Sequence, residues 1–205
     1  ETLMAGSFVP IIVGVAAIIA LIAFVLRQLS LGKSDQAFLD LRVFAVPGFA
    51  IAIILVMVIF GLLLGLVTVL PIYLQKAILV TTAVSGLVVM PGGLLQGLAA
   101  PFIGRLYDRV GVRPLMIPGI ILVAISTGLL TWAAYQRFGP IAMAMLYVLF
   151  EVGIALAITP LYTASLSSLP AHLYSHGSAT LSTAQQLASA IGVAILVAVL
   201  TQQTN

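Results

Sequence analysis

Residues 43–75 form a run of 33 residues without one charged side chain. As an α-helix the run would be about 50 Å long, whereas the hydrocarbon core of a bilayer is about 30 Å thick. A backbone that crosses this core must satisfy its own hydrogen bonds, and a helix does so within a single segment. The run therefore predicts a membrane-spanning helix. We expect it to start near Pro47, because proline suits a first helical turn, and to end near Leu74.

The composition extends this prediction to the whole chain. Of its 205 residues, 62% are hydrophobic and 6% are charged, which is more apolar surface than a water-soluble domain of this size can bury. We therefore predict an all-α, polytopic membrane protein with about six transmembrane helices. The other five spans are expected at about residues 8–26, 80–104, 114–135, 140–161 and 177–201, with the last break at residues 163–176.

Lysine and arginine in the connections predict the orientation, because positively charged loops stay in the cytoplasm. Three lysine or arginine residues lie in connection 27–46, three lie in connection 105–113 and none lies in connection 162–176. Connections 75–79 and 136–139 hold one such residue each. Loops 27–46 and 105–113 are therefore expected to be cytoplasmic. The net charge of +3 comes from these few residues and does not indicate a nucleic-acid partner. Both ends then lie outside, which fits a chain lacking helices at either end.

The segment GRLYDRVGVR, residues 104–113, packs three arginines and one aspartate into ten residues. This segment resembles the signature G-x-L-x-D-R-x-G-x-R of the major facilitator superfamily. In that family the signature lies between the second and third helices of a six-helix half. The matching residues are Gly104, Leu106, Asp108, Arg109, Gly111 and Arg113, and Tyr107 takes a place usually held by a small residue.

Three further segments, LPIYLQ at 70–75, GLVVMPGG at 86–93 and QQLASAIGVA at 185–194, resemble the fourteen-helix drug:proton antiporters. The resemblance implies the C-terminal portion of a major facilitator fold. Residues 1–45 would be an extra linker helix with its cytoplasmic connector, and residues 46–205 would be five of the six helices of the C-terminal bundle. The implied partners are the N-terminal half of the same transporter, the bilayer and lipophilic or cationic small molecules. Protons would be the coupling ion, with no other cofactor, in the inner membrane of a bacterium.

Glu151 is the sharpest candidate for a functional side chain. It follows Pro140 by eleven residues, about 16 Å along a helix, and so lies near the middle of the bilayer. A charged carboxylate there costs roughly 2.5–3.5 kcal/mol, so such a group is normally neutral, paired or facing a wet cavity. Glu151 suits a proton carrier or a partner for a cationic substrate. The alternative is a protonated side chain that only joins two helices.

Four further polar or helix-breaking features are candidates for the same cavity. Pro91, Gly92 and Gly93 would interrupt the third span, so that freed carbonyls face a cavity, although a packing kink explains them equally well. Gln96, one turn later, would add a polar contact. Gln185 would do the same from the last span, or would hydrogen-bond between helices. Tyr73 would line an aromatic surface for a lipophilic cation, or belong to the interfacial belt.

The charged segment has a possible gating role. Asp108, Arg109 and Arg113 would form a charge-paired latch across the cytoplasmic helix ends, which stabilises one access state. Otherwise they are plain topology determinants, each exposed pair contributing about 0–1 kcal/mol. Gly104 would allow close helix approach, and Gly111 a turn with positive φ.

A second glycine pair, Gly61 and Gly65, forms Gly-x-x-x-Gly on the second span. This spacing predicts close helix packing, either within the chain or in a dimer.

We therefore predict part of a proton-coupled multidrug efflux transporter that works by alternating access. The alternatives are a facilitator-type transporter of another small molecule and a non-transporting membrane scaffold. An enzyme is not expected, because no nucleophile and base converge at one depth. No metal site is expected either, because the chain has no cysteine and no metal-ligand spacing.

Overall fold

The computed structural model describes residues 15–16, 19, 23, 27 and 41–203. Residues 41–203 form five long α-helices and two short 3-10 helices. The elements are η2 (Leu41–Ala45), α2 (Pro47–Lys76), α3 (Thr82–Val110), α4 (Arg113–Tyr135), α5 (Pro140–Ser167), η3 (Ala171–Leu173) and α6 (Tyr174–Gln203). In this part of the chain all five α-helices have the length and apolar composition of a membrane span. The predicted span at residues 8–26 lies almost entirely outside the described residues, and the boundary at residue 45 stays a prediction.

The helix starts follow from local sequence. Proline stands in the first turn of α2, α4 and α5, where a missing N–H leaves no hydrogen bond unmade. The start of α2 at Pro47 confirms the prediction. At the start of α3, the Thr81 hydroxyl caps the helix by accepting a 3.4 Å hydrogen bond from the Val84 N–H.

The break between the last two spans is shorter than predicted. It was expected over residues 163–176, but α5 continues to Ser167 and α6 begins at Tyr174. Hydroxyl groups in this segment do not end the helix, because they donate to carbonyls of the preceding turn. Thr163, for example, donates to the Thr159 carbonyl at 3.1 Å. The break therefore comes only at residues 168–173, around Pro170.

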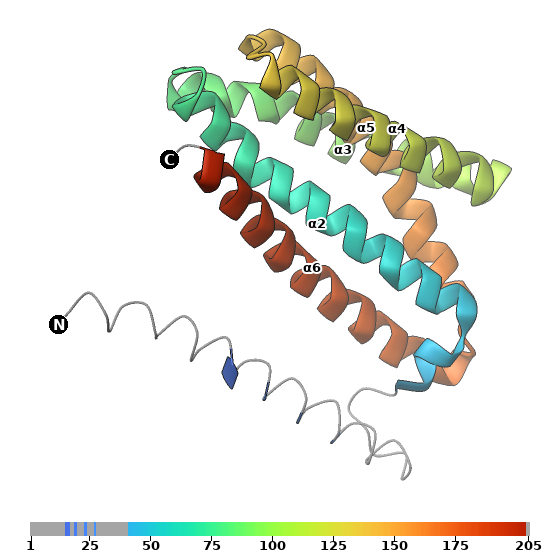
Figure 1. Cartoon of the computed structure of the whole chain (residues 1–205). Coiled ribbons are helices and arrows are strands. Elements are labelled where there is room, and N and C mark those ends of the chain that lie inside the picture. Colours follow the sequence, from blue (N-terminus) through green and yellow to red (C-terminus); the bar gives the residue numbers. More distant parts are fainter. Residues whose placement is uncertain (1–14, 17–18, 20–22, 24–26, 28–40, 204–205) are drawn as a thin grey trace.

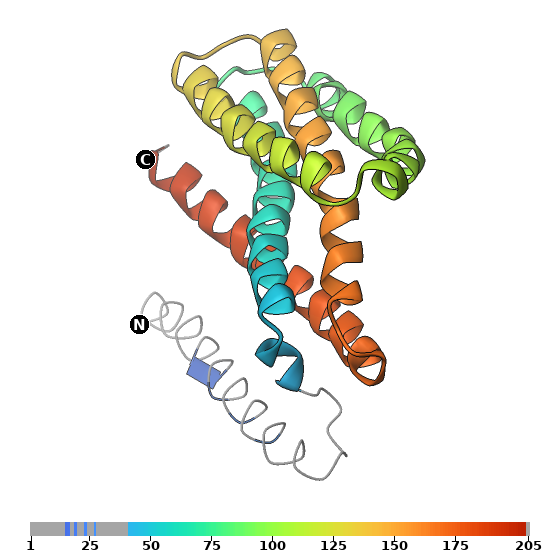
Figure 2. The same cartoon turned by 90° about the vertical axis from the view of Figure 1, so that its right-hand side faces the viewer.

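The helices pack as two connected groups (Figures 1 and 2). Helix α6 lies along α2, while α5 packs against both α3 and α4. Contacts from α2 to α5 and α3 join the groups, and α5 and α6 touch little. The space between α2 and the α3–α5 pair is consequently the main seam of this part of the chain.

Glycines allow two close helix crossings. A Cβ on Gly192 of α6 would collide with the backbone of Gly61 of α2, and a Cβ on Gly65 would collide with the Leu196 side chain. This confirms the packing predicted for the Gly-x-x-x-Gly pair, which lies within the chain. Between α4 and α5, Cβ atoms on Gly119 and Gly153 would each come within 3.0 Å of the other glycine's carbonyl oxygen. Small residues let such backbones approach, as is typical of membrane helices.

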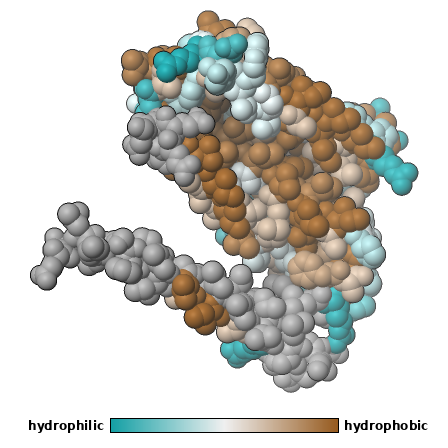
Figure 3. All heavy atoms as spheres, viewed as in Figure 1, coloured by the Kyte–Doolittle hydropathy of each residue, from teal (hydrophilic) through white to brown (hydrophobic). Residues whose placement is uncertain are grey.

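The outer surface of the bundle is largely apolar. Figure 3 shows hydrophobic side chains over the lengths of the helices, with hydrophilic residues gathered towards the helix ends. On α4 the exposed hydrophobic residues recur every four positions, at Ile117, Ile121, Ile125 and Leu129. A stripe of this kind is expected where lipid covers a helix.

Candidate functional site

Glu151 lies inside the protein, on the middle part of α5. Its side chain is 1% exposed. The Tyr147 hydroxyl, one turn earlier on the same helix, donates a 2.5 Å hydrogen bond to Glu151 Oε1. The other carboxyl oxygen, Oε2, is buried and has no hydrogen-bond partner among the residues that the structure describes. The carboxyl group thus faces neither lipid nor the membrane surface.

Gly92 of α3 packs against the Glu151 and Tyr147 side chains. A Cβ on Gly92 would lie 2.7 Å from Glu151 Cγ and 2.8 Å from Tyr147 Cε1, closer than real side-chain contacts. The predicted helix break at Pro91, Gly92 and Gly93 is wrong, because α3 is continuous from Thr82 to Val110. Proline removes only one backbone hydrogen bond, and the rest of the helix, packed on α5, continues through it.

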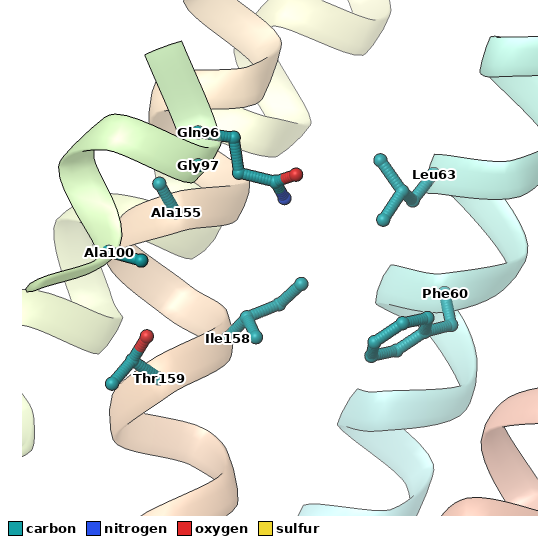
Figure 4. A pocket seen from close by; sticks show the side chains of 8 residues that line it. All are labelled: Phe60, Leu63, Gln96, Gly97, Ala100, Ala155, Ile158 and Thr159. Atoms are coloured by element: carbon teal, nitrogen blue, oxygen red, sulfur yellow. The ribbon is translucent and has the colours of Figure 1, made fainter. Parts of the chain in front are cut away.

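A cavity of about 310 Å³ lies beside this buried group, in the seam between α2 and the α3–α5 pair. Figure 4 shows Phe60 and Leu63 of α2 on one side and residues of α3 and α5 on the other. Its lining residues are Phe60, Leu63, Gln96, Gly97, Ala100, Ala155, Ile158 and Thr159.

The cavity and the buried carboxyl group are one helical turn apart on both helices. Gln96 follows Gly92 by four residues on α3, and Ala155 follows Glu151 by four on α5. Residues at this spacing are neighbours on a helix face. The Gln96 side chain extends towards α2 (Figure 4) and lines the cavity, as predicted.

Two other predicted cavity residues lie elsewhere. The Tyr162 hydroxyl of α5 donates to Gln185 Oε1 of α6, so Gln185 joins helices rather than lining this cavity. The Tyr162 ring packs edge-on against Phe60, with ring centroids 6.1 Å apart. The Tyr73 hydroxyl donates to the Ala134 carbonyl at 2.7 Å and joins the ends of α2 and α4.

The predicted gating segment is mostly helical. Helix α3 continues to Val110, and only residues 111–112 separate it from α4. Gly111 has φ 81°, which confirms the predicted positive-φ turn.

The charged side chains Asp108, Arg109 and Arg113 are exposed. No ion pair links them within residues 41–203, so the charge-paired latch is not formed in this conformation. At Gly104 a Cβ would meet no described atom within 4 Å, so close helix approach is not observed there.

Two residues of the site escaped the sequence analysis. Tyr147 precedes Glu151 by four residues, and Thr159 follows it by eight. The helical spacing of these three residues was the only available signal. It does not reveal which face of α5 meets α3. Among the described residues no group of three His, Cys, Asp or Glu side chains is placed to hold a metal ion.

Comparison with known proteins gives one family. The profile of the Major Facilitator Superfamily matches residues 4–193. No solved structure matches the chain.

Several of the matched relatives are named as resistance proteins. The lincomycin resistance protein LmrB of Listeria innocua is 38% identical over 89% of this chain and 38% of its own length. Its namesake in Bacillus subtilis is 34% identical over 94% of this chain and 39% of its own length. The multidrug resistance protein B homolog of Mycobacterium tuberculosis is 30% identical over 96% of this chain and 36% of its own length. The chain thus spans less than two fifths of the length of each of these relatives.

Proposed function

The chain belongs to the Major Facilitator Superfamily, and from this premise we propose that it is the C-terminal portion of a proton-coupled multidrug exporter. Such a protein would reside in the inner membrane of a bacterium. It would exchange protons for lipophilic small molecules by alternating access and would catalyse no chemical reaction. The N-terminal half of the same transporter would be its partner, and the transport cavity would lie between the two halves. Relatives named for lincomycin and multidrug resistance support drug export as the activity.

The observation that carries the proposal is the buried Glu151 carboxyl group. A carboxylate that is buried with one hydrogen bond is much less stable than the neutral acid. Its second oxygen loses its hydration and accepts no hydrogen bond in exchange. In this conformation the group is therefore suited to hold a proton. An alternating-access motion that separates α3 from α5 would expose the carboxyl group to water, where it releases that proton.

The position of the cavity supports coupling. A molecule bound between Phe60 of α2 and Gln96 of α3 would occupy the seam one helical turn from Glu151. Movement of α3 would change the space around both the bound molecule and the Glu151 carboxyl group. Substrate binding and proton release are then linked through the same helix pair, which is the requirement for exchange.

The test is Glu151→Gln, expressed from the complete reading frame that encodes this chain and reconstituted in vesicles. The amide keeps the size of the side chain but carries no exchangeable charge. We expect proton-driven efflux to fall at least tenfold, while substrate exchange without a proton gradient persists. Glu151→Asp, which keeps a carboxyl group, is expected to retain more of the proton-driven rate.

Tyr147→Phe serves as a second variant, because it removes only the hydrogen bond to Oε1. Its matched control is Tyr135→Phe, at the exposed end of α4. Unchanged proton-driven efflux in Glu151→Gln would refute the proton-carrier role of Glu151, whereas absence of any efflux by the wild type would favour the scaffold alternative.

A further inference from the structure

The cavity between α2, α3 and α5 has no charged wall. Its eight lining residues are apolar or small, apart from the Gln96 amide and the Thr159 hydroxyl. The carboxyl group of Glu151 lies one helical turn along α5 from the cavity, and this residue is 1% exposed and packs against Gly92. A molecule in this partly open cavity therefore meets no countercharge from the described part of the chain, and a cation there would lose part of its hydration without an ion pair in return.

The two polar groups of the wall are free to bind a ligand. The Gln96 amide makes no hydrogen bond within residues 41–203, and it extends into the seam towards Leu63 (Figure 4). The Thr159 hydroxyl also has no partner there. By contrast, hydroxyls such as those of Thr127 and Thr163 donate to carbonyls of their own helix.

Both free groups can donate to one ligand atom. The amide offers two N–H groups besides its carbonyl oxygen, and the hydroxyl offers one O–H besides its own lone pairs. A strong acceptor that bears no hydrogen, such as a carbonyl or phosphoryl oxygen, can receive these bonds and leaves no buried donor of its own unpaired. The rest of the wall, including the Phe60 ring, contacts the apolar body of the ligand.

We propose that this cavity binds uncharged, largely apolar molecules that present one strong hydrogen-bond acceptor to Gln96 and Thr159. This inference rests on the proposed function and narrows its substrate class, since lipophilic cations are not what these walls recognise. The volume of about 310 Å³ fits a compact molecule with two or three rings. Glu151 would then bind the coupling proton and make no contact with the substrate.

Two size-matched probes test the proposal. Triphenylphosphine oxide is uncharged and carries a phosphoryl acceptor, whereas methyltriphenylphosphonium is a cation without an acceptor. Binding of each radiolabelled probe is measured on the purified protein, expressed from its complete reading frame, in lipid nanodiscs. We expect the oxide to bind at least tenfold more tightly than the phosphonium.

Matched variants locate the binding site. Gln96→Leu is expected to weaken oxide binding about tenfold and to leave phosphonium binding unchanged, because one hydrogen bond to a buried acceptor is lost. Gln186→Leu on the exposed face of α6 is the control and is expected to match the wild type. Thr159→Val should weaken oxide binding by a smaller factor than Gln96→Leu does. Its control is Thr163→Val, one turn later on α5.

The outcomes separate this inference from the proposed function. Equal or tighter binding of the phosphonium, or oxide binding that Gln96→Leu leaves within twofold of the wild type, overturns the cavity assignment. If proton-driven efflux of other compounds persists in that case, the exporter proposal stands. If the oxide binds as expected but a proton gradient drives no efflux, the cavity assignment stands and the exporter proposal fails.

Discussion

Gly92 and Gly93 are neighbours in α3, but only Gly92 contacts another helix. A side chain at Gly92 would enter the space occupied by Tyr147 and Glu151, whereas a Cβ on Gly93 would meet no described atom within 4 Å. The same dipeptide thus holds one residue on which the burial of Glu151 depends and one with no packing role in this part of the chain. Helix rotation places them 100° apart, which decides the difference.

This difference gives a prediction at the residue scale. Gly92→Ala is expected to destabilise the protein by about 1–3 kcal/mol, as overpacking of a tight contact does. Gly93→Ala, the matched control, is expected to be neutral or slightly stabilising, because alanine is the better helix former. Apparent melting temperatures of the two variants in detergent measure the difference. Equal losses in both would contradict the close contact between α3 and α5.

At the scale of elements, α5 is the helix on which the site is built. It carries the Tyr147–Glu151 pair and three lining residues of the cavity, and Gly153 lets α4 cross it closely. On the other side of the seam, α2 contributes Phe60 and is paired with α6 through glycines. Movement of the α2–α6 pair relative to α5 would therefore change the width of the cavity.

The α2–α6 contact gives the prediction at this scale. In Gly192→Ala the new methyl group would meet the backbone of Gly61, which cannot rotate away as a side chain does. We expect a loss of about 1–3 kcal/mol in unfolding free energy. Gly128→Ala on α4 is the control, because its Cβ would lie in open space among the described residues. Unfolding in a graded detergent mixture compares the two, and a stability of Gly192→Ala equal to that of the control would argue against this helix pairing.

At the scale of the whole molecule, the connections alternate between two ends of the bundle. The α3–α4 and α5–α6 connections lie at one end, and the α2–α3 and α4–α5 connections lie at the other (Figure 1). The exposed Asp108, Arg109 and Arg113 make no ion pairs at the first end within the described residues. Any latch that they form must involve another access state or another part of the protein.

The alternation is testable by labelling, since the chain contains no cysteine. Single cysteines at Val112 and Ser168 are expected to react with a membrane-impermeant maleimide only from the cytoplasmic side. Cysteines at Leu79 and Gln136 are expected to react only from outside, because the three arginines are predicted to keep the α3–α4 connection in the cytoplasm. Labelling of Val112 and Leu79 from the same side would contradict the arrangement of the spans.

The sequence by itself determined the fold class, the family and the approximate positions of the five spans that the structure describes. Long uncharged runs and clustered arginines report directly on membrane crossing and orientation, because the bilayer acts on each segment separately. It also singled out Glu151 and Gln96, since polar side chains are rare at such depth. The tertiary structure decided which polar residues share a cavity. Gln185 and Tyr73 were predicted to join Glu151, but they bond elsewhere, and Gly92 proved to be a contact rather than a break. Such outcomes depend on helix rotation and on close approach between residues far apart in the chain, and no periodicity within one helix specifies them.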